Sequence, residues 1–478
     1  MHTADQAAHD QKAESRQPWF PLILLSLAQF MVVLDVTVVN VALPSIGEDL
    51  GFAAGDLQWV VTAYVLFTGG LLLLGGRAAD MLGRRRVFLT GLVIFTAASL
   101  ASGLAASPGQ LIVSRAVQGL GAAMLSPAAL SLITATYSGA QRTTALTIWG
   151  AIAASGAAAG MLFGGMLTTW LSWEWIFYIN VPVGIATGLL SLRAIAPAAG
   201  SGGLRRLDLL GALTLVSGLV LLVYAIQGTD TAGWGSPETL SLFGASAVLL
   251  AGFIAAERSA RQPLVPPATW RVRTLVSAAG LMLGAMGFLA GYIFLGSLYM
   301  QGSLGMSALE TGLAFLPLAV VIGLGSHVAP QLLARLGARA VAIVGLLAMA
   351  GGAGLLASAP DQASYAGDLL PGLLVGGIGI GLVFVTIQVT GMSEVRSETA
   401  GLASGMITTA HEIGAAFGVA VLSAVAASAG EGAAALASPA GFEAGITVAG
   451  SIALGLAVIA AATVPAIRPV APAQVSIH

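Results

Sequence analysis

The sequence predicts an all-α membrane protein that crosses the bilayer about 14 times. Three observations support this fold class. First, 57% of the 478 residues are hydrophobic and only 8% are charged, whereas soluble domains carry about 25% charged residues. Second, apolar runs of about 20 residues, long enough to cross the hydrocarbon core, follow one another along the whole chain. Third, basic and acidic residues are sorted into alternate connections between these runs.

The apolar runs give the expected spans in order. They lie near 20–44, 57–79, 87–106, 108–135, 143–169, 175–193, 208–227, 236–256, 274–301, 308–333, 339–358, 365–391, 399–428 and 441–466. Because their number is even, we expect both termini on the same side of the membrane. The polar segment before the first span lacks the residue order of a cleavable signal, so we expect a cytoplasmic tail there.

The sorting of charges predicts the orientation. If the N-terminus is cytoplasmic, every Lys and Arg except Arg115 falls in or beside a cytoplasmic connection. The outer connections then carry acids such as Glu48, Asp56 and Asp368. This is the distribution that the positive-inside rule describes. We therefore expect a multi-pass protein of the cell membrane with cytoplasmic termini.

Two cytoplasmic connections are similar to each other. LGRRRVFLTG at 82–91 and LGARAVAIVG at 336–345 share Leu, Gly, Arg, Val and Gly in register. If spans seven and eight are an insertion, each connection joins the second and third spans of a six-helix half. Repeated halves around a central site are a common construction of membrane transporters. The alternative is a chance similarity between two loops rich in Gly and Arg.

Three ionisable residues interrupt the apolar spans: Asp35, Arg115 and Glu412. An isolated Asp at the centre of a spanning helix costs about 2.5–3.5 kcal/mol, so a partner is expected. A rise of about 1.5 Å per residue places the three groups at similar depth, with Asp35 in the outer half of its helix. We therefore expect Asp35 and Arg115 to neutralise each other and Glu412 to face the same aqueous cavity.

Other polar residues of these spans are candidates for lining that cavity, namely Asn40, Gln118 and His411. Less specific interpretations stay open for all of these positions. The ion pair could be purely structural, and the glutamate could be a buried acid with satisfied hydrogen bonds. His411 and His327 could be packing residues.

The fifth span contains a stripe of glycines, Gly156, Gly160 and Gly164, at a spacing of four residues. Such stripes allow two membrane helices to approach closely, either statically or during a movement of the helices.

Several kinds of chemistry have no sequence support. The chain has no cysteine, which excludes disulfides and thiolate metal sites. It has no phosphate-binding GxxxxGK[ST] loop and no nucleophile–base pair or metal-ligand cluster at a consistent depth. We therefore expect no enzyme activity, no metal and no cofactor. Any pump must therefore use an ion gradient.

Several motifs resemble a known family. GRAADMLGRRR (76–86) resembles the loop signature of the major facilitator superfamily, and LIVSRAVQGLGAA (111–123) resembles its span-four motif. LDVTVVNVALP (34–44) resembles the span-one motif of its 14-span drug:proton antiporters of the EmrB/QacA type. The stretches 58–66 and 170–184 are similar to that subfamily as well.

Two positions depart from the family pattern. Met161 stands where the span-five antiporter motif has a proline, and Glu174 stands where a basic residue is usual. The methionine at position 161 weakens the expectation of drug–proton exchange, although the glycine spacing of the motif is kept.

The resemblance implies a major facilitator fold, with two six-helix halves plus two extra helices. It implies secondary active multidrug efflux that exchanges inward-moving protons for amphipathic cationic or neutral compounds by alternating access. Asp35, Glu412 and Arg115 would form the proton and substrate site. The loop residues Gly76, Asp80, Gly83, Arg84 and Arg85 would gate the cytoplasmic side, where Asp80 and Arg84 would contact neighbouring helix ends.

The expected organisation follows. We expect a tail at 1–18, a six-helix half at 19–194, two inserted helices with linkers at 195–273, a second half at 274–467 and a tail at 468–478. The expected partners are small drug-like molecules and the lipid bilayer, without nucleic acid, and the expected state is a monomer. Three alternatives remain: a dedicated exporter of one endogenous metabolite or antibiotic, an uptake symporter, and a membrane receptor that transports nothing.

Overall fold

The computed structural model describes residues 18–53, 56–196, 208–260, 263–360, 362–396, 399–430 and 434–464. Most of the two predicted tails and of the first linker lies outside these described residues. Within them, 14 helices are long and apolar enough to cross a membrane. The predicted all-α fold with 14 spans is therefore confirmed.

Helices dominate because a segment in lipid must satisfy its backbone hydrogen bonds internally. The spanning helices are α2 (Phe20–Leu50), α3 (Trp59–Leu82), α4 (Arg84–Gly103), α5 (Pro108–Thr136), α6 (Gly139–Trp170), α7 with α8 (Trp175–Tyr178 and Asn180–Ala194), α9 (Leu209–Gln227), α11 (Pro237–Ser259), α12 (Arg273–Gly302), α13 (Ala308–Leu336), α14 (Ala338–Ala357), α15 (Leu370–Met392, after the π-helical turn η3, Tyr365–Leu369), α16 (Ala400–Ser428) and α18 (Pro439–Thr463). Shorter elements are α10 (Thr229–Ala232), η2 (Thr269–Arg271) and α17 (Ala434–Ala437).

We call the side of the membrane where α2 begins and α18 ends the terminal side, and the opposite side the far side. Serine caps mark the start of several helices on the far side. In each case the serine hydroxyl accepts a hydrogen bond from a backbone N–H of the first turn, which would otherwise lack a partner. These serines are Ser107, Ser236, Ser307, Ser364 and Ser438. The far-side boundaries of these helices are therefore set by local sequence.

The first helix is longer than predicted because Pro44 does not end it. α2 continues to Leu50, and Asp35 consequently lies near its middle rather than in its outer half. A proline inside a helix leaves the carbonyl four residues earlier without its N–H partner. Here that carbonyl belongs to Asn40, and it accepts a hydrogen bond from Ser297 Oγ of α12 at 2.8 Å. A residue of another helix thus satisfies the group that the proline leaves free.

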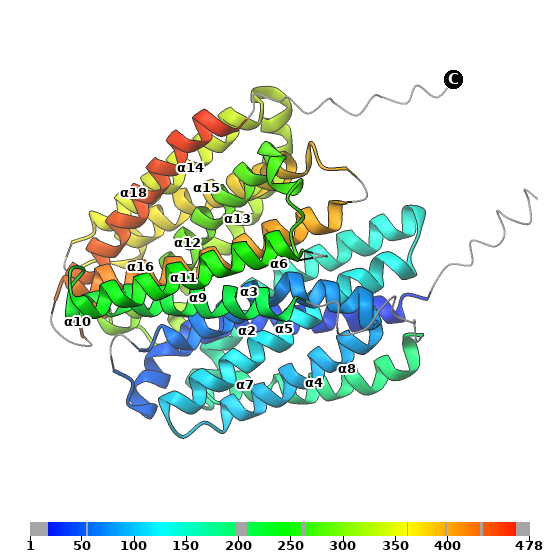
Figure 1. The fold of residues 1–478 in the computed structure, drawn as a ribbon. Helices are drawn as coiled ribbons and strands as arrows, with labels where there is room; N and C mark the ends of the chain where they lie inside the picture. Colours follow the sequence, from blue (N-terminus) through cyan, green and yellow to red (C-terminus); the bar gives the residue numbers. More distant parts are fainter. Residues whose placement is uncertain are drawn as a thin grey trace, which may run out of the picture.

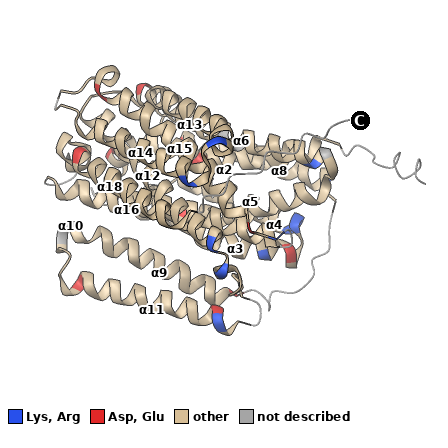
Figure 2. Ribbon diagram, turned by 90° about the horizontal axis from the view of Figure 1, so that it is seen from above, with Lys and Arg blue, Asp and Glu red and all other residues tan. Residues whose placement is uncertain are grey.

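The helices form two groups with a pair beside them. Figure 1 shows α2–α8 in blue to cyan as one group and α12–α18 in green to red as the other, while α9 and α11 lie in front. Figure 2 shows α9 and α11 as a separate pair at the edge of the bundle, and α9 contacts α3 and α16. Most acidic residues lie toward the end that carries α10, and most basic residues lie toward the other end (Figure 2). The orientation in the membrane stays a prediction.

The two similar connections have the same structure. Gly83 and Gly337 each separate two helices at a positive φ, 100° and 83°, which favours glycine. Two residues later, an arginine binds the end of the last helix of its own half. Arg85 Nη2 donates to the carbonyl of Leu192 in α8 at 2.5 Å, and Arg339 Nε donates to that of Val464 after α18 at 2.7 Å. Both arginines satisfy C-terminal carbonyls and complement the helix dipole.

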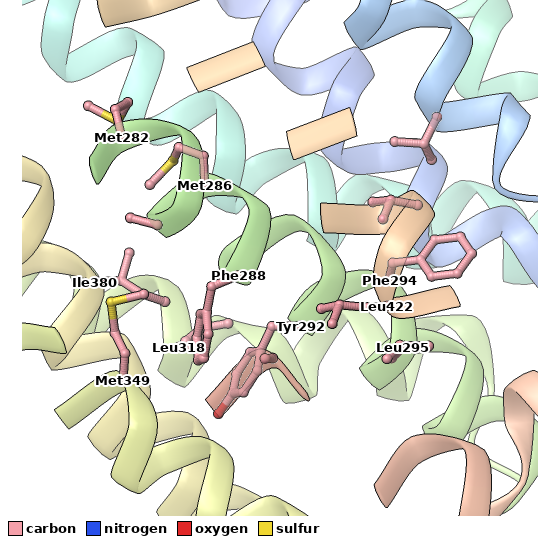
Figure 3. Close-up of a cluster of buried hydrophobic side chains, with 14 of the residues drawn as sticks. Met282, Met286, Phe288, Tyr292, Phe294, Leu295, Leu318, Met349, Ile380 and Leu422 are labelled. Carbon is pink, nitrogen blue, oxygen red and sulfur yellow. The ribbon is translucent and has the colours of Figure 1, made fainter. Parts of the chain in front are cut away.

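α12 lies at the centre of the second half. Figure 3 shows its side chains Met282, Met286, Phe288, Tyr292, Phe294 and Leu295 among Leu318, Met349, Ile380 and Leu422 of the surrounding helices. Phe288 and Tyr292 stack with ring centroids 5.1 Å apart, and the Tyr292 hydroxyl donates to the carbonyl of Gly372 at 2.8 Å. Lipid tails are as apolar as these side chains, so their packing contacts, rather than exclusion from water, hold this half together.

The predicted glycine stripe of α6 lies against α2. A Cβ atom on Gly160 would lie 2.8 Å from the carbonyl oxygen of Leu34, and one on Gly164 would lie 2.7 Å from that of Val38. The corresponding contact of Gly156 is 3.3 Å. Any larger residue at the two closest positions would force the backbones of α2 and α6 apart.

The two groups of helices meet on the far side. Besides the bond from Ser297, Gln301 Nε2 donates to the carbonyl of Val41 at 2.9 Å. Leu309 N donates to Thr169 Oγ1 at 3.1 Å, which joins the far ends of α13 and α6. In contrast, most described residues of α6 before Gly156 are exposed or half-buried. The two halves are therefore joined by hydrogen bonds on the far side.

Replacement of Gly160 by alanine should lower the free energy of unfolding by about 1–3 kcal/mol, because the added methyl group overpacks the α2–α6 contact. The matched control is Gly150→Ala on the same helix, where an added Cβ meets open space. Thermal unfolding of both purified variants in detergent measures the difference. Equal midpoints would contradict the role of the stripe.

Candidate functional site

Asp35 is completely buried and its charge is fully partnered. Its Oδ2 atom lies 2.5 Å from Arg115 Nη1 of α5. Its Oδ1 atom accepts hydrogen bonds from Gln118 Nε2 at 2.8 Å and from Asn180 Nδ2 of α8 at 2.9 Å. The exposed fractions of the Asp35 and Arg115 side chains are 0% and 1%. The predicted pairing of these two residues is therefore present in the structure.

Arg115 has further partners that hold its guanidinium group. Its Nε atom donates to the carbonyl of Val60 in α3 at 2.9 Å, and its Nη1 atom also donates to Gln118 Oε1 at 2.7 Å. The guanidinium carbon lies 4.3 Å from the ring centroid of Tyr64 and 5.6 Å from that of Phe177. Cation–π contacts gain strength where water is excluded. The guanidinium group of Arg115 is thus contacted by residues of four elements, α2, α3, α5 and α7.

Sequence reasoning missed three residues of this site, Asn180, Ser99 and Tyr64. Asn180 bridges Asp35 to Ser99 Oγ of α4, at 3.1 Å, and the Ser99 hydroxyl donates to the carbonyl of Phe177 at 2.9 Å. Tyr64 supplies the ring beneath the guanidinium. Both Asn180 and Tyr64 lie in stretches that resemble the antiporter subfamily, and that resemblance was the available signal. We call Asp35, Arg115, Gln118, Asn180 and Ser99 the Asp35 cluster.

Glu412 lies apart from the Asp35 cluster. Its side chain is 17% exposed, and its Oε1 atom lies 3.2 Å from Nδ1 of the neighbouring His411, which is 37% exposed. Glu412 packs on α3 at Gly69, where its Cβ atom is 2.6 Å from an ideal glycine Cβ. The other predicted histidine, His327, is exposed on α13.

The expected common cavity is not formed in this conformation, because the acid on α2 is closed off from solvent. The Asp35 cluster, through Arg115, and Glu412 both border α3, but on different faces. Thr68 Oγ1 of α3 contacts the carbonyl of Gly119 in α5 at 3.3 Å, whereas the next residue, Gly69, faces α16. A buried ion pair is stable only when all its partners are in place, and in this conformation the Asp35 carboxylate has all of them.

Of the residues expected to line a cavity, Gln118 belongs to the Asp35 cluster instead. Asn40 is 7% exposed, and its amide donates to the carbonyl of Val36 at 3.0 Å within α2. Its own backbone carbonyl takes part in the contact between the halves. His411 is therefore the most accessible of the three.

The loop signature lies at the terminal side, between α3 and α4. Asp80 and Arg84 form an exposed pair at 3.7 Å, with exposed fractions of 64% and 38%. The contact with a neighbouring helix end is made by Arg85 rather than by Arg84. Gly76 of α3 faces Pro127 of α5, with 3.6 Å between an added Cβ and the proline Cβ. The gating role of these residues stays a prediction.

Met161, which replaces the usual proline, lies where the two halves meet. It is 3% exposed, and its carbonyl oxygen lies 2.4 Å from the ideal Cβ position of Gly312 in α13. A methionine keeps the N–H that a proline would lack, so α6 continues without interruption from Gly139 to Trp170. The unbroken helix accounts for the regular spacing of its glycine contacts.

Comparisons with known proteins identify the family. The model of the Major Facilitator Superfamily matches residues 25–419. The chain belongs to the major facilitator superfamily. Its relatives include the puromycin resistance protein pur8 of Streptomyces alboniger, 41% identical over 85% of this chain and 81% of that protein. The cephamycin export protein CmcT of Amycolatopsis lactamdurans is 42% identical over 84% of this chain and 83% of that protein.

A solved structure shows the same fold. The nucleoside transporter NupG superposes with a TM-score of 0.64 at 14% identity, over 93% of this chain and 99% of that one. The superfamily protein described here is therefore a multi-pass membrane transporter and not an enzyme. Its 14 spans agree with the 14-span group that the sequence resembles.

Replacement of Asp35 by asparagine should lower the free energy of unfolding by about 3–5 kcal/mol, because the guanidinium of Arg115 stays buried without its counter-ion. The double variant Asp35→Asn/Arg115→Gln should recover part of that loss. Thermal unfolding of the two single variants and the double variant forms a double-mutant cycle. A double variant that loses the sum of the two single effects would show that the pair is not coupled.

Proposed function

We propose that the protein is a secondary active exporter of the cell membrane with both termini in the cytoplasm. It exchanges inward-moving protons for amphipathic cationic or neutral organic compounds by alternating access. The observation that carries the proposal is the pair of acids: Asp35 is sealed against Arg115, while Glu412 is partly exposed on the opposite half. Relatives named for antibiotic resistance and export support the direction of transport.

The proposed cycle begins from an inward-facing state, in which a substrate binds from the terminal side near Glu412. When the halves close on that side and open on the far side, the Asp35 cluster loosens and a proton from outside reaches a carboxylate. A proton on Asp35 would leave Arg115 without its counter-ion inside the protein, which is costly. Proton uptake and opening of the cluster are therefore linked, and the loss of negative charge weakens the hold on a cationic substrate.

The free energy available supports such an exchange. One proton that crosses about 100 mV releases about 2.3 kcal/mol. A pH difference of one unit adds about 1.4 kcal/mol, the value of a tenfold concentration ratio. Together they sustain a gradient of a few hundred-fold for a neutral substrate at one-to-one exchange. Export therefore requires no nucleotide hydrolysis.

A narrower candidate is a dedicated exporter of one antibiotic. The names of two relatives favour it, because one refers to puromycin and the other to cephamycin. Both candidates use the same fold and the same coupling ion. They differ in how many chemically unrelated compounds the site accepts.

In everted membrane vesicles with an acidic lumen, addition of a transported cation should release protons from the lumen. Asp35→Asn should abolish this release. Glu412→Gln should change the range of compounds that trigger it, because a local negative charge is removed. The control is Glu238→Gln, an exposed acid in the first turn of α11.

Because Asp35→Asn is expected to be unstable, the amount of each variant in the membrane is measured by immunoblot. The double variant with Arg115→Gln provides a second test if the single variant is degraded. Normal proton release by either Asp35 variant would contradict the proposed role of Asp35.

Expression in a drug-sensitive host should raise resistance to several amphipathic cations and antibiotics, with puromycin and a cephamycin in the panel. An uncoupler should abolish the reduced accumulation of each compound. Resistance to a single compound would favour the dedicated exporter. Accumulation that does not respond to the uncoupler would contradict proton coupling.

A further inference from the structure

The α9–α11 pair, which lies beside the two six-helix halves, is attached to α3 along most of its length. At the far end, Gln227 Nε2 of α9 donates to Asp56 Oδ1 at 3.2 Å, and Gln227 Oε1 accepts from Trp59 Nε1. At mid-height, Val216 of α9 fills the space above Gly70, where its Cγ2 atom is 2.7 Å from an ideal glycine Cβ. These contacts fix α9 to the first half at two levels.

A third contact lies on the terminal side. Arg77 Nη1 of α3 donates to the carbonyl of Pro263, in the segment that follows α11, at 2.6 Å. Glu257 in the last turn of α11 accepts the backbone N–H groups of Leu264 and Val265 at 3.1 and 2.9 Å, which holds this segment against α11. The α9–α11 pair is therefore bound to α3 by polar groups at both ends and by close packing between them.

The contact between α9 and α16 has a different character. Leu219 and Val223 of α9 share a buried apolar cluster with Ala416 and Ala420 of α16. On the α16 side, the partly buried Ile413 and Phe417 pack against the same cluster, so this contact is made of apolar side chains. Apolar packing of this kind has no directional bonds that must break when one helix shifts along another.

Two consecutive glycines place this contact beside the acid on α16. Gly69 accommodates the Cβ atom of Glu412, and Gly70 accommodates Val216. α9 and Glu412 therefore pack against adjacent faces of α3 at the same level. Since α9 contacts both α3 and α16, it covers the line where these two helices of opposite halves meet.

We infer that the α9–α11 pair is a fixed side wall of the first half that seals the α3–α16 seam beside Glu412. When the halves alternate, a movement that rests on the proposed function, α16 slides along α9 while α9 keeps its position on α3. The wall keeps lipid from Glu412 in both states. Protons and substrate then reach this acid only from the space between the halves.

Pairs of spin labels test which half the wall moves with. The chain has no cysteine, so single cysteines can be introduced without removing any. Suitable exposed far-side positions are Leu104 after α4, Leu240 on α11 and Ser358 after α14. When the pH or a transported drug shifts the Leu104–Ser358 distance, the Leu240–Ser358 distance should shift with it and the Leu104–Leu240 distance should stay constant. A constant Leu240–Ser358 distance with a changing Leu104–Leu240 distance would overturn the inference.

A disulfide provides the second test. An ideal Cβ on Gly70 lies 3.8 Å from the Cβ of Val216, close to the mean separation of about 3.8 Å in disulfides. The Gly70→Cys/Val216→Cys pair should therefore crosslink under mild oxidation in native membranes, and the oxidised protein should keep at least half of its transport. In the matched control, Gln58→Cys/Ser423→Cys, the bond replaces a contact of 2.7 Å between the halves and should abolish transport reversibly.

The two experiments separate failure of the inference from failure of the proposed function. Loss of transport after oxidation of the Gly70–Val216 pair, with recovery on reduction, would show that α9 must move on α3. If the Leu104–Ser358 distance never changes, the alternation itself is refuted. In that case crosslinking alone tests the attachment of α9 to α3. Failure of the Gly70→Cys/Val216→Cys pair to crosslink would overturn this attachment.

Discussion

A single buried carboxylate organises the first half of the protein. In lipid, an unpaired charge is costly, and Asp35 is neutralised only because α2, α5 and α8 meet around it. Arg115 adds α3 through the carbonyl of Val60, and Asn180 adds α4 through Ser99. All five helices must be in place before every hydrogen bond and the ion pair of the cluster can form. The cluster therefore favours one arrangement of this half over looser alternatives, at a cost in stability if any member is lost.

Much of this architecture could be predicted from the sequence, because the bilayer imposes simple rules. Apolar runs gave the number of spans, and counting residues along two helices brought Asp35 and Arg115 to similar depth. The end of α2 was mispredicted for a physical reason. Pro44 would normally weaken a helix, and the group that compensates for it, Ser297, lies in a distant part of the chain. No local pattern contains that information.

The candidate site was less predictable than the fold. A tyrosine or an asparagine in an apolar run is compatible with many environments, so Tyr64 and Asn180 carried no distinct signal apart from family resemblance. The expected common cavity is absent from this conformation, because the position of a residue along a helix does not determine the direction in which its side chain points. Asp35 points into its own half, whereas Glu412 packs on the other face of α3. The packing of α3, with Gly69 against Glu412 and Tyr64 against Arg115, separates them.

Pro44 also frees one of the main-chain groups through which α12 binds α2 on the far side. There Ser297 and Gln301 bind the main-chain oxygens of Asn40 and Val41, not their side chains. Every residue has a carbonyl, so this closure is indifferent to the identity of the amino acid at either position. Substitutions on this stretch of α2 can therefore change its side chains without removing these two hydrogen bonds. The bonds between the halves and the variable chemistry of the side chains thus reside in different atoms of the same residues.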